Sequence, residues 1–518
     1  MKRSIAVALT VLFGVLAAPA AAHAAPNTGL SFGPCPADVE VAPGSGTECA
    51  VVSVPMDYSA PSGRQIDVTV SRIAAAADRR GAIFVNPGGP GGDALSFWGR
   101  HAADMPADLR AHYDQFAVQP RGLRWSTPLE CGADSTVGAR NSLRANCERA
   151  QPGYVQTITT ENTARDMDAV RAELGLDRIS FLGVSYGTYL GAVYASQFPE
   201  RVDRLILDSN VNPQWVWTEL FAQQQVAAKG RYEDLFGWIA ANNATYGLGD
   251  SPLRVFESWT SLVVNEGGGW YANLTPPSVT GADLPTFFSE PLAAIARQGF
   301  DSSVEQIAKV QNLMRAVTFG TASPNTPLLG ATGVATYSRK FWPLLAQAMA
   351  DVKADPTNTQ PLLAIGDRTT SDPTSTYVLS AITCNENANP ARPDLISAAL
   401  STIASGGNAM DARADLVRTG VACSGWPAVT KPVHIADHGL ATPPLILQSR
   451  HDAKTKFDGG PAMAAALGGS LITVEGGDHG VFGRRNPQVD DAVLAYLNTG
   501  RVTTDHADEA PLPAPPVG

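Results

Sequence analysis

The chain has 518 residues, of which 44% are hydrophobic and 17% are charged, so it carries enough apolar material for a large core and does not have the composition of a disordered protein. Its formal net charge of −11 provides no basic field that would attract nucleic acid or an anionic membrane surface. One large globular domain or two moderate ones are therefore expected, with no nucleic-acid partner.

The N-terminus has the pattern of a secretory signal peptide. Basic residues at positions 2 and 3 precede an apolar run, and Ala22, His23 and Ala24 form a small-x-small cleavage site. The run is too short for a membrane anchor and Pro19 interrupts its end; no later segment is long and apolar enough to cross a bilayer. We expect cleavage near Ala24 and a secreted protein, extracellular or associated with the cell wall, without stable membrane insertion.

Six cysteines follow the signal peptide, and an even number in an exported chain favours disulfides over free buried thiols. No Cys-x-x-Cys spacing occurs. Sequential pairing closes the shortest loops of all the possible connectivities. It is the pairing that we predict: Cys35 with Cys49, Cys131 with Cys147, and Cys384 with Cys423.

Strands and helices alternate over the first part of the mature chain. The alternating run at residues 65–73 predicts a half-buried antiparallel strand. Short apolar runs that begin at Gly81, Phe116, Arg178 and Arg204 predict further strands, with an amphipathic helix over residues 162–174. This alternation is typical of a parallel, doubly wound sheet covered by helices.

The alternation stops near residue 212 and returns after a long helical and irregular stretch. Strand-like runs then begin at Pro444 and Ser470, and a last helix is expected around residues 490–497. The sequence therefore predicts an α/β fold with a mostly parallel sheet and a large, mainly helical cap insertion. The expected division is a signal peptide at 1–24, a core at 25–212 and 436–500, a cap at 213–435 and a Pro-rich tail at 501–518.

The motif GVSYG, residues 183–187, has the form Gly-x-Ser-x-Gly. It follows a predicted strand and precedes a helix that starts with small residues, which is the context of a strained elbow that exposes a nucleophilic serine. A tight turn without chemistry is the alternative. The context favours Ser185 as a nucleophile.

A serine hydroxyl needs a base, and the base needs a third group to orient it. In doubly wound hydrolases these groups follow the serine in the order Asp, His, at the carboxyl ends of later strands. Asp452 and His479 follow the two returning strands in this order. Asp458 and Asp437 are rival candidates for the acid.

The oxyanion of an acyl-transfer reaction needs backbone donors. Tyr186, directly after the serine, supplies one, and the loop NPGGPGG at residues 86–92 supplies the other, for which Gly89 is expected. A phosphate-binding loop is the alternative, but Pro90 and the absence of G-x-G-x-x-G spacing oppose it. His434 and His438 lie in a loop without a third ligand, so neither a metal nor another cofactor is expected.

From about Cys49 to Leu497 the chain resembles the secreted tripeptidyl-aminopeptidase-like branch of the α/β-hydrolase superfamily, actinobacterial relatives of proline iminopeptidase. The resemblance rests on VPMDYSAP, NPGGPGG, QPRG, the run at residues 162–210, ITCNEN, CSGWP, SRHDAKT and GGDHG. It implies an exopeptidase that releases tripeptides or single residues from free N-termini. It also implies the same roles by position: nucleophile Ser185, acid Asp452, base His479, and oxyanion donors Gly89 and Tyr186.

The chain departs from the family pattern at Asp93, Gln119, Arg124, Trp125 and Lys456, and these departures indicate an altered substrate preference. An esterase or amidase acting on a small molecule, such as a natural-product intermediate, is therefore the second hypothesis. An exported binding protein on a retained hydrolase scaffold is the third.

An aminopeptidase must pair the substrate ammonium with a carboxylate, because burying that charge alone is costly. Glu386, beside Cys384 in the insertion, is the candidate for this role. The expected partners are a peptide or a small ester or amide substrate, and the protein is expected to be a monomer.

Overall fold

The computed structural model describes residues 29–41, 44–132, 137–284, 290–318, 322–366 and 372–512. Within them, one nine-stranded sheet has the order β1-β2-β4-β3-β5-β6-β7-β8-β9. The strands are β1 Glu48–Pro55, β2 Gln65–Ile73, β3 Gly81–Asn86, β4 Tyr113–Val118, β5 Ile179–Val184, β6 Val202–Asp208, β7 Leu445–Ser449, β8 Ser470–Glu475 and β9 His506–Asp508. Only β2 runs against its neighbours, and every pair from β4 to β9 is parallel.

Apolar side chains at alternate positions of the strands pack into two hydrophobic clusters, one on each face of the sheet. Phe181 and Leu205 belong to the cluster that packs under one group of helices, whereas Leu182 and Ile206 belong to the cluster on the opposite face. Because both faces are covered, the central strands are buried along nearly their whole length.

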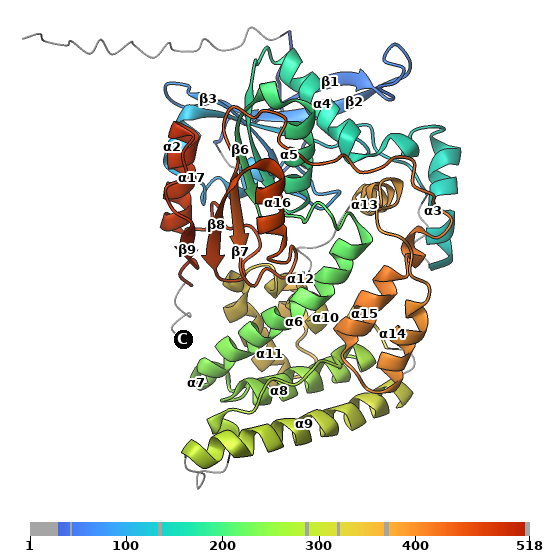
Figure 1. Ribbon diagram of the computed structural model, residues 1–518, viewed down its shortest axis with the longest axis vertical. Helices are drawn as coiled ribbons and strands as arrows, with labels where there is room; N and C mark the ends of the chain where they lie inside the picture. The colour runs from blue at the N-terminus through green and yellow to red at the C-terminus, as the bar shows by residue number, and fades with distance from the viewer. Residues whose placement is uncertain are drawn as a thin grey trace, which may run out of the picture.

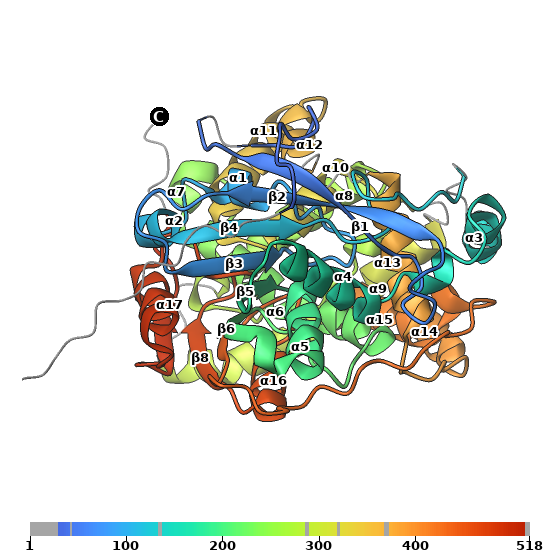
Figure 2. The ribbon, with the colours of Figure 1, turned by 90° about the horizontal axis from the view of Figure 1, so that it is seen from above.

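The helices that cover these faces come from both ends of the chain (Figures 1 and 2). On one face lie α4 Thr160–Glu173, α5 Tyr186–Gln197 and α16 Gly459–Leu467. On the other lie α1 Phe97–His101, α2 Ala107–His112 and α17 Pro487–Thr499. Helix α3 Val137–Ala150 lies outside these two layers (Figure 2).

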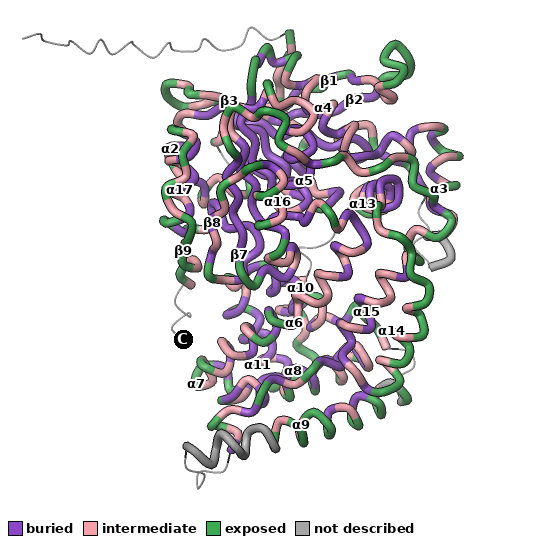
Figure 3. The backbone as a smooth tube through the Cα atoms, in the orientation of Figure 1, coloured by how far each residue is buried: buried purple, intermediate pink, exposed green. Residues whose placement is uncertain are grey.

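The chain leaves the sheet after β6 and returns to it at β7, and the segment between them is helical. Its helices are α6 Thr218–Ala241, α7 Asn243–Tyr246, α8 Pro252–Asn265, α9 Glu290–Thr318, α10 Pro327–Ala335, α11 Trp342–Ala354, α12 Gln360–Gly366, α13 Pro373–Asn385, α14 Leu395–Ala404 and α15 Ala409–Arg418. This segment has its own apolar cluster, built around Trp259, and lies at the end of the molecule opposite β1 (Figures 1 and 3). Helix α13 and the start of α6 also reach the core, since Val378, Ile382 and Leu220 belong to the cluster that contains α5. We refer to the segment as the cap.

The fold class, and every strand and helix expected from the sequence, are confirmed. Two strands were not expected: β1 lies within a stretch dominated by Pro, Gly and Ser, and β9 lies within the Pro-rich tail range. The three predicted disulfides are confirmed, and the described residues contain no free cysteine. The expected signal peptide falls outside the described residues. No helix in the described ranges is long and apolar enough to cross a membrane.

Candidate active site

Ser185 lies at the turn between β5 and α5. Its backbone φ of 60° is one that L-residues rarely adopt, and it turns the chain directly from strand into helix. A side chain at Gly183 would clash with the carbonyl of Gly187, and a side chain at Gly187 would clash with the carbonyl of Asn86. The strand–turn–helix context that the sequence predicts is therefore present, and both glycines of the motif are sterically required.

His479 and Asp452 meet at the carboxyl ends of the neighbouring strands β8 and β7. The Nδ1 atom of His479 lies 3.0 Å from each carboxylate oxygen of Asp452, and both side chains are buried. Burial alone would raise the pKa of Asp452, but His479 and the backbone N–H groups of Thr455 and Lys454 hold that pKa below its ordinary value. Asp452 therefore stays a carboxylate that can orient the imidazole.

The rival acids take no part in this pair. Asp458 forms an ion pair with Lys456 at the start of α16, and Asp437 accepts hydrogen bonds from the N–H groups of Gly439 and Leu440. Both aspartates are exposed. The geometry thus favours Asp452, which the chain order also favoured.

A buried carboxylate that the sequence analysis missed holds the loop of His479. Asp208, the last residue of β6, accepts hydrogen bonds at Oδ2 from the N–H groups of Val481 (2.8 Å) and Phe482 (2.9 Å). Burial raises the pKa of Asp208 to about 6, although these two N–H groups act in the opposite direction. Its neighbour Ser209 accepts a hydrogen bond from the N–H of Gly480. One signal in the sequence could have identified Asp208: it lies at the carboxyl end of the predicted strand that follows the strand leading to Ser185.

The glycine loop after β3 crosses the elbow. A side chain at Gly88 would lie 2.7 Å from Cβ of Ser185 and 3.1 Å from the backbone nitrogen of Tyr186. That nitrogen is the first of helix α5, where N–H groups have no acceptor within the helix. Gly89 lines the same cavity as Ser185. The glycine loop therefore lies directly against the elbow and the start of α5.

Two cavities meet above the serine. The smaller, about 320 Å³, is lined by Ser185, His479, Gly89 and Asp208 from the core, and by residues of the cap. The larger, about 590 Å³, lies mainly among cap helices and shares Gln224, Tyr337 and Lys454 with the first. Its size is that of a ligand site.

Comparison with known proteins identifies the family. Residues 81–260 match a family described as alpha/beta hydrolase fold, and residues 409–509 match one described as TAP-like protein. The tripeptidyl aminopeptidase of Streptomyces lividans is 32% identical, covering 96% of this chain and 90% of that protein. The chain belongs to the tripeptidyl-aminopeptidase-like family of α/β-hydrolases. It is therefore a serine hydrolase.

Two more distant relatives carry different names. The serine protease Hip1 of Mycobacterium bovis is 26% identical, covering 88% of this chain and 86% of that protein. Carboxylesterase B of Mycobacterium tuberculosis is 27% identical, covering 87% of this chain and 84% of that protein. The relatives named tripeptidyl aminopeptidase and serine protease Hip1 support a serine peptidase.

Glu386 lies at the end of α13 and is buried. It accepts hydrogen bonds from the backbone N–H (3.3 Å) and the hydroxyl of Thr160 and from Nε1 of Trp217 (3.2 Å). Burial raises the pKa of Glu386 to about 7, and the donors of Thr160 and Trp217 oppose this rise. It is not among the described residues that line the cavity at Ser185.

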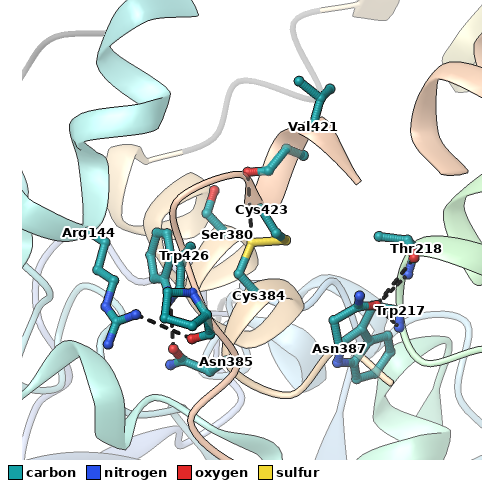
Figure 4. Close-up of a disulfide and its surroundings, with 12 residues drawn as sticks. Arg144, Trp217, Thr218, Ser380, Cys384, Asn385, Asn387, Val421, Cys423 and Trp426 are labelled. Carbon is teal, nitrogen blue, oxygen red and sulfur yellow. Dashed lines mark hydrogen bonds between the residues drawn. A yellow bond between two sulfur atoms is a disulfide. The ribbon is translucent and has the colours of Figure 1, made fainter. Parts of the chain in front are cut away.

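The segment that carries Glu386 is held by a disulfide and by hydrogen bonds. Cys384, two residues before it, is bonded to Cys423, and Oδ1 of Asn387 accepts the N–H of Trp217 at 2.9 Å (Figure 4). These bonds join the last part of the cap to its first residues.

Four of the departures from the family pattern lie away from Ser185. Asp93, Gln119, Arg124 and Trp125 line a separate cavity of about 320 Å³ on the other side of the glycine loop. Any influence on the substrate would therefore act through that loop. Within the described ranges, His, Cys, Asp and Glu form no group of three or more that could hold a metal ion, and His434 and His438 belong to none.

Proposed function

We propose that the protein is a secreted serine exopeptidase that releases short peptides or single residues from free N-termini through an acyl-enzyme on Ser185. One observation carries the proposal: the elbow serine and His479, which is paired with Asp452, line one cavity. The relative named tripeptidyl aminopeptidase supports the substrate class. The N-terminal pattern of residues 1–24 and three disulfides support secretion, and we expect a monomer.

In this mechanism the Oγ atom of Ser185 attacks the substrate carbonyl carbon while Nε2 of His479 takes the hydroxyl proton. Asp452 holds Nδ1–H and stabilises the imidazolium that forms. The imidazolium then gives its proton to the leaving amine as the C–N bond breaks. Water attacks the resulting ester while His479 accepts a proton from that water. The bond between the acyl carbon and Oγ then breaks, His479 returns the proton to Oγ, and the released acid leaves Ser185 and His479 in their starting states.

The tetrahedral intermediate carries a negative oxygen. The backbone N–H groups of Gly89 and Tyr186 are the proposed donors, since both belong to segments that are fixed before substrate arrives. Fixed donors need no reorganisation as the charge develops, so this half of the site lowers the barrier without moving.

Aminoacyl and tripeptidyl aminocoumarin amides, each with a free and an acetylated N-terminus, test the exopeptidase mode. Free substrates should be cleaved and acetylated ones should react far more slowly. Equal cleavage of the two would exclude an aminopeptidase and favour the second candidate, an esterase or amidase. The relative named carboxylesterase B supports that alternative, and simple nitrophenyl esters would then be the better substrates.

Glu386 is the proposed partner of the substrate ammonium. Glu386→Gln should lower kcat/KM for free N-termini by about tenfold to a thousandfold, the range expected when a desolvated charge pair is lost. The same variant should leave hydrolysis of a simple neutral ester unchanged. If both substrates lose activity equally, Glu386 acts instead by supporting Thr160 and Tyr186, to which its hydrogen bonds connect it.

A further inference from the structure

The two cavities above Ser185 are lined by positive side chains in a protein whose net charge is −11. The basic residues that line them are Lys340, Arg413, Lys454 and Arg484. Among the described lining residues the only carboxyl is that of Asp208, which already accepts two backbone N–H groups. The charge of the site is thus opposite in sign to that of the molecule.

Lys454 lies where the two cavities join, close to the reacting groups. It follows the acid Asp452 by two residues, and its Nζ atom lies 4.1 Å from the centre of the Tyr337 ring. Tyr337 in turn meets the ring of His479 edge-on, and its carbonyl accepts the N–H of His479 at 2.8 Å. Only one aromatic ring therefore separates the ammonium of Lys454 from the imidazole.

Lys454 forms no ion pair with a carboxylate of the described residues, although the charge of Asp452 acts on it. The nearest acid by sequence, Asp452, is already bonded to His479, Thr455 and a backbone N–H. Arg413, which reaches the larger cavity from α15, makes no ion pair with a described residue either, and its charge acts on Lys454. Two cations, one from the core and one from the cap, thus face the same space, and an anion between them would relieve their repulsion.

We infer that Lys454, together with Arg413, binds a carboxylate of the substrate, so that the preferred acyl group is acidic. In an exopeptidase the fragment to be released is enclosed as the acyl group, whereas the rest of the peptide must extend to solvent. The larger cavity lies beyond Lys454 from Ser185 and so would hold an acidic side chain of that fragment. This inference rests on the proposed function and assigns to the substrate an aspartate or glutamate side chain near the scissile bond.

The test uses tripeptidyl aminocoumarin amides that differ only in carrying glutamate, glutamine or lysine at one position of the released fragment. Wild-type protein should prefer the glutamate substrate over the glutamine one by about tenfold or more in kcat/KM, with lysine the poorest. Lys454→Met should bring the ratio of kcat/KM between the glutamate and glutamine substrates close to one, and Lys454→Arg should retain the wild-type ratio. Lys456→Gln is the matched control, because Lys456 pairs with Asp458 and does not line either cavity.

Equal rates for glutamate and glutamine substrates would overturn the inference and leave the exopeptidase assignment intact. If no peptide amide is cleaved, the proposed function fails instead, and nitrophenyl hemiglutarate against nitrophenyl butyrate then decides the charge preference. A peptide with a free C-terminus and its C-terminal amide distinguish the source of the carboxylate. A preference for the free acid that Lys454→Met removes would put the carboxylate on the leaving group and overturn the acyl-side assignment.

Discussion

The core half and the cap half of the active site are built in different ways. The core half consists of strand ends and backbone bonds: Ser185 is fixed by the elbow, and the loop of His479 is fixed by N–H groups bound to Asp208. The cap half consists of side chains such as Tyr337, Gln224 and Arg413, which come from three separate segments. From this contrast we expect variants that disturb the backbone framework of the core to lower kcat, and variants of the side chains that line the cavities to change the substrate preference.

The largest effect is expected at the elbow. Ser185→Ala should lower kcat by about four orders of magnitude or more, because no other group can form the acyl-enzyme. The melting temperature should stay close to that of the wild type, since alanine fits the space of serine. Labelling by a fluorophosphonate should also be lost. As a control, Ser196→Ala, on the same helix, should remain active and labelled; activity of the Ser185 variant near the wild-type level would contradict the nucleophile assignment.

A smaller effect is expected where the core holds its base in place. Asp208→Ala should lower kcat by about tenfold to a hundredfold with little change in KM, because the N–H groups of Val481 and Phe482 lose their acceptor and the loop of His479 shifts. Asp208→Asn keeps an acceptor oxygen and should recover most of the rate. Steady-state kinetics on one good substrate measures both constants.

Asp490 offers a matched comparison for Asp208. It is also a carboxyl whose pKa is raised to about 6 by burial, and it accepts the N–H of Gly483 in the same loop. Because Asp490 bonds Gly483 and not the residues next to His479, Asp490→Ala should lower the free energy of unfolding and change kcat little. If the two alanine variants lose kcat equally, the loop acts as a whole and Asp208 has no special part in positioning His479.

Where the core and the cap meet at Lys454, the preference for an acidic substrate should depend on pH. Burial, with a contribution from Arg413, lowers the pKa of Lys454 to about 8, while Asp452 acts to raise it. Lys454 is charged below this pKa, so the glutamate preference in kcat/KM should be complete near pH 7 and fall as pH rises through about 8. Lys454→Arg should keep the preference at higher pH; a profile unchanged by that variant would assign the titration to another group.

The smallest effect on chemistry is expected from the disulfides. Replacing Cys384 and Cys423 by serine opens a loop with a sequence separation of 39 and should lower the free energy of unfolding by about 4 kcal/mol. Replacing Cys35 and Cys49, with a separation of 14, should cost about 3 kcal/mol. Both double variants should keep kcat for a neutral ester. Loss of kcat in the first alone would mean that the chemistry of the core depends on the cap.

The sequence was most informative where local pattern and backbone geometry coincide. The elbow needs glycines at fixed positions, and parallel strands bring their carboxyl ends to one edge, so Ser185, Asp452 and His479 could be selected before any contact was known. The sequential disulfides followed from loop length. Strand β1 was missed because the surrounding Pro, Gly and Ser hid a short apolar run, although it pairs with the next strand, β2. Strand β9 was missed because its three residues include one apolar side chain and its pairing with β8 has no local signal.

Side chains brought together by tertiary packing could not be predicted in the same way. Glu386 was selected by its neighbours in sequence, but its partners Thr160 and Trp217 lie 226 and 169 residues away. Lys454 lies within the SRHDAKT motif, but the motif pointed only to Asp452; the proposed role of Lys454 depends on the ring of Tyr337 and on a helix of the cap. No spacing rule relates such positions, because each depends on how the insertion folds back over the sheet.

The insertion joins β6 to β7, which are adjacent and directly paired through Ile206 and Leu445. Residues can therefore be gained or lost between these strands during evolution without altering the register of any strand. Gene duplication followed by divergence of this one segment would give enzymes with new substrate specificities and the same catalytic residues. This segment is therefore a suitable unit to exchange between homologues in recombination experiments on this fold.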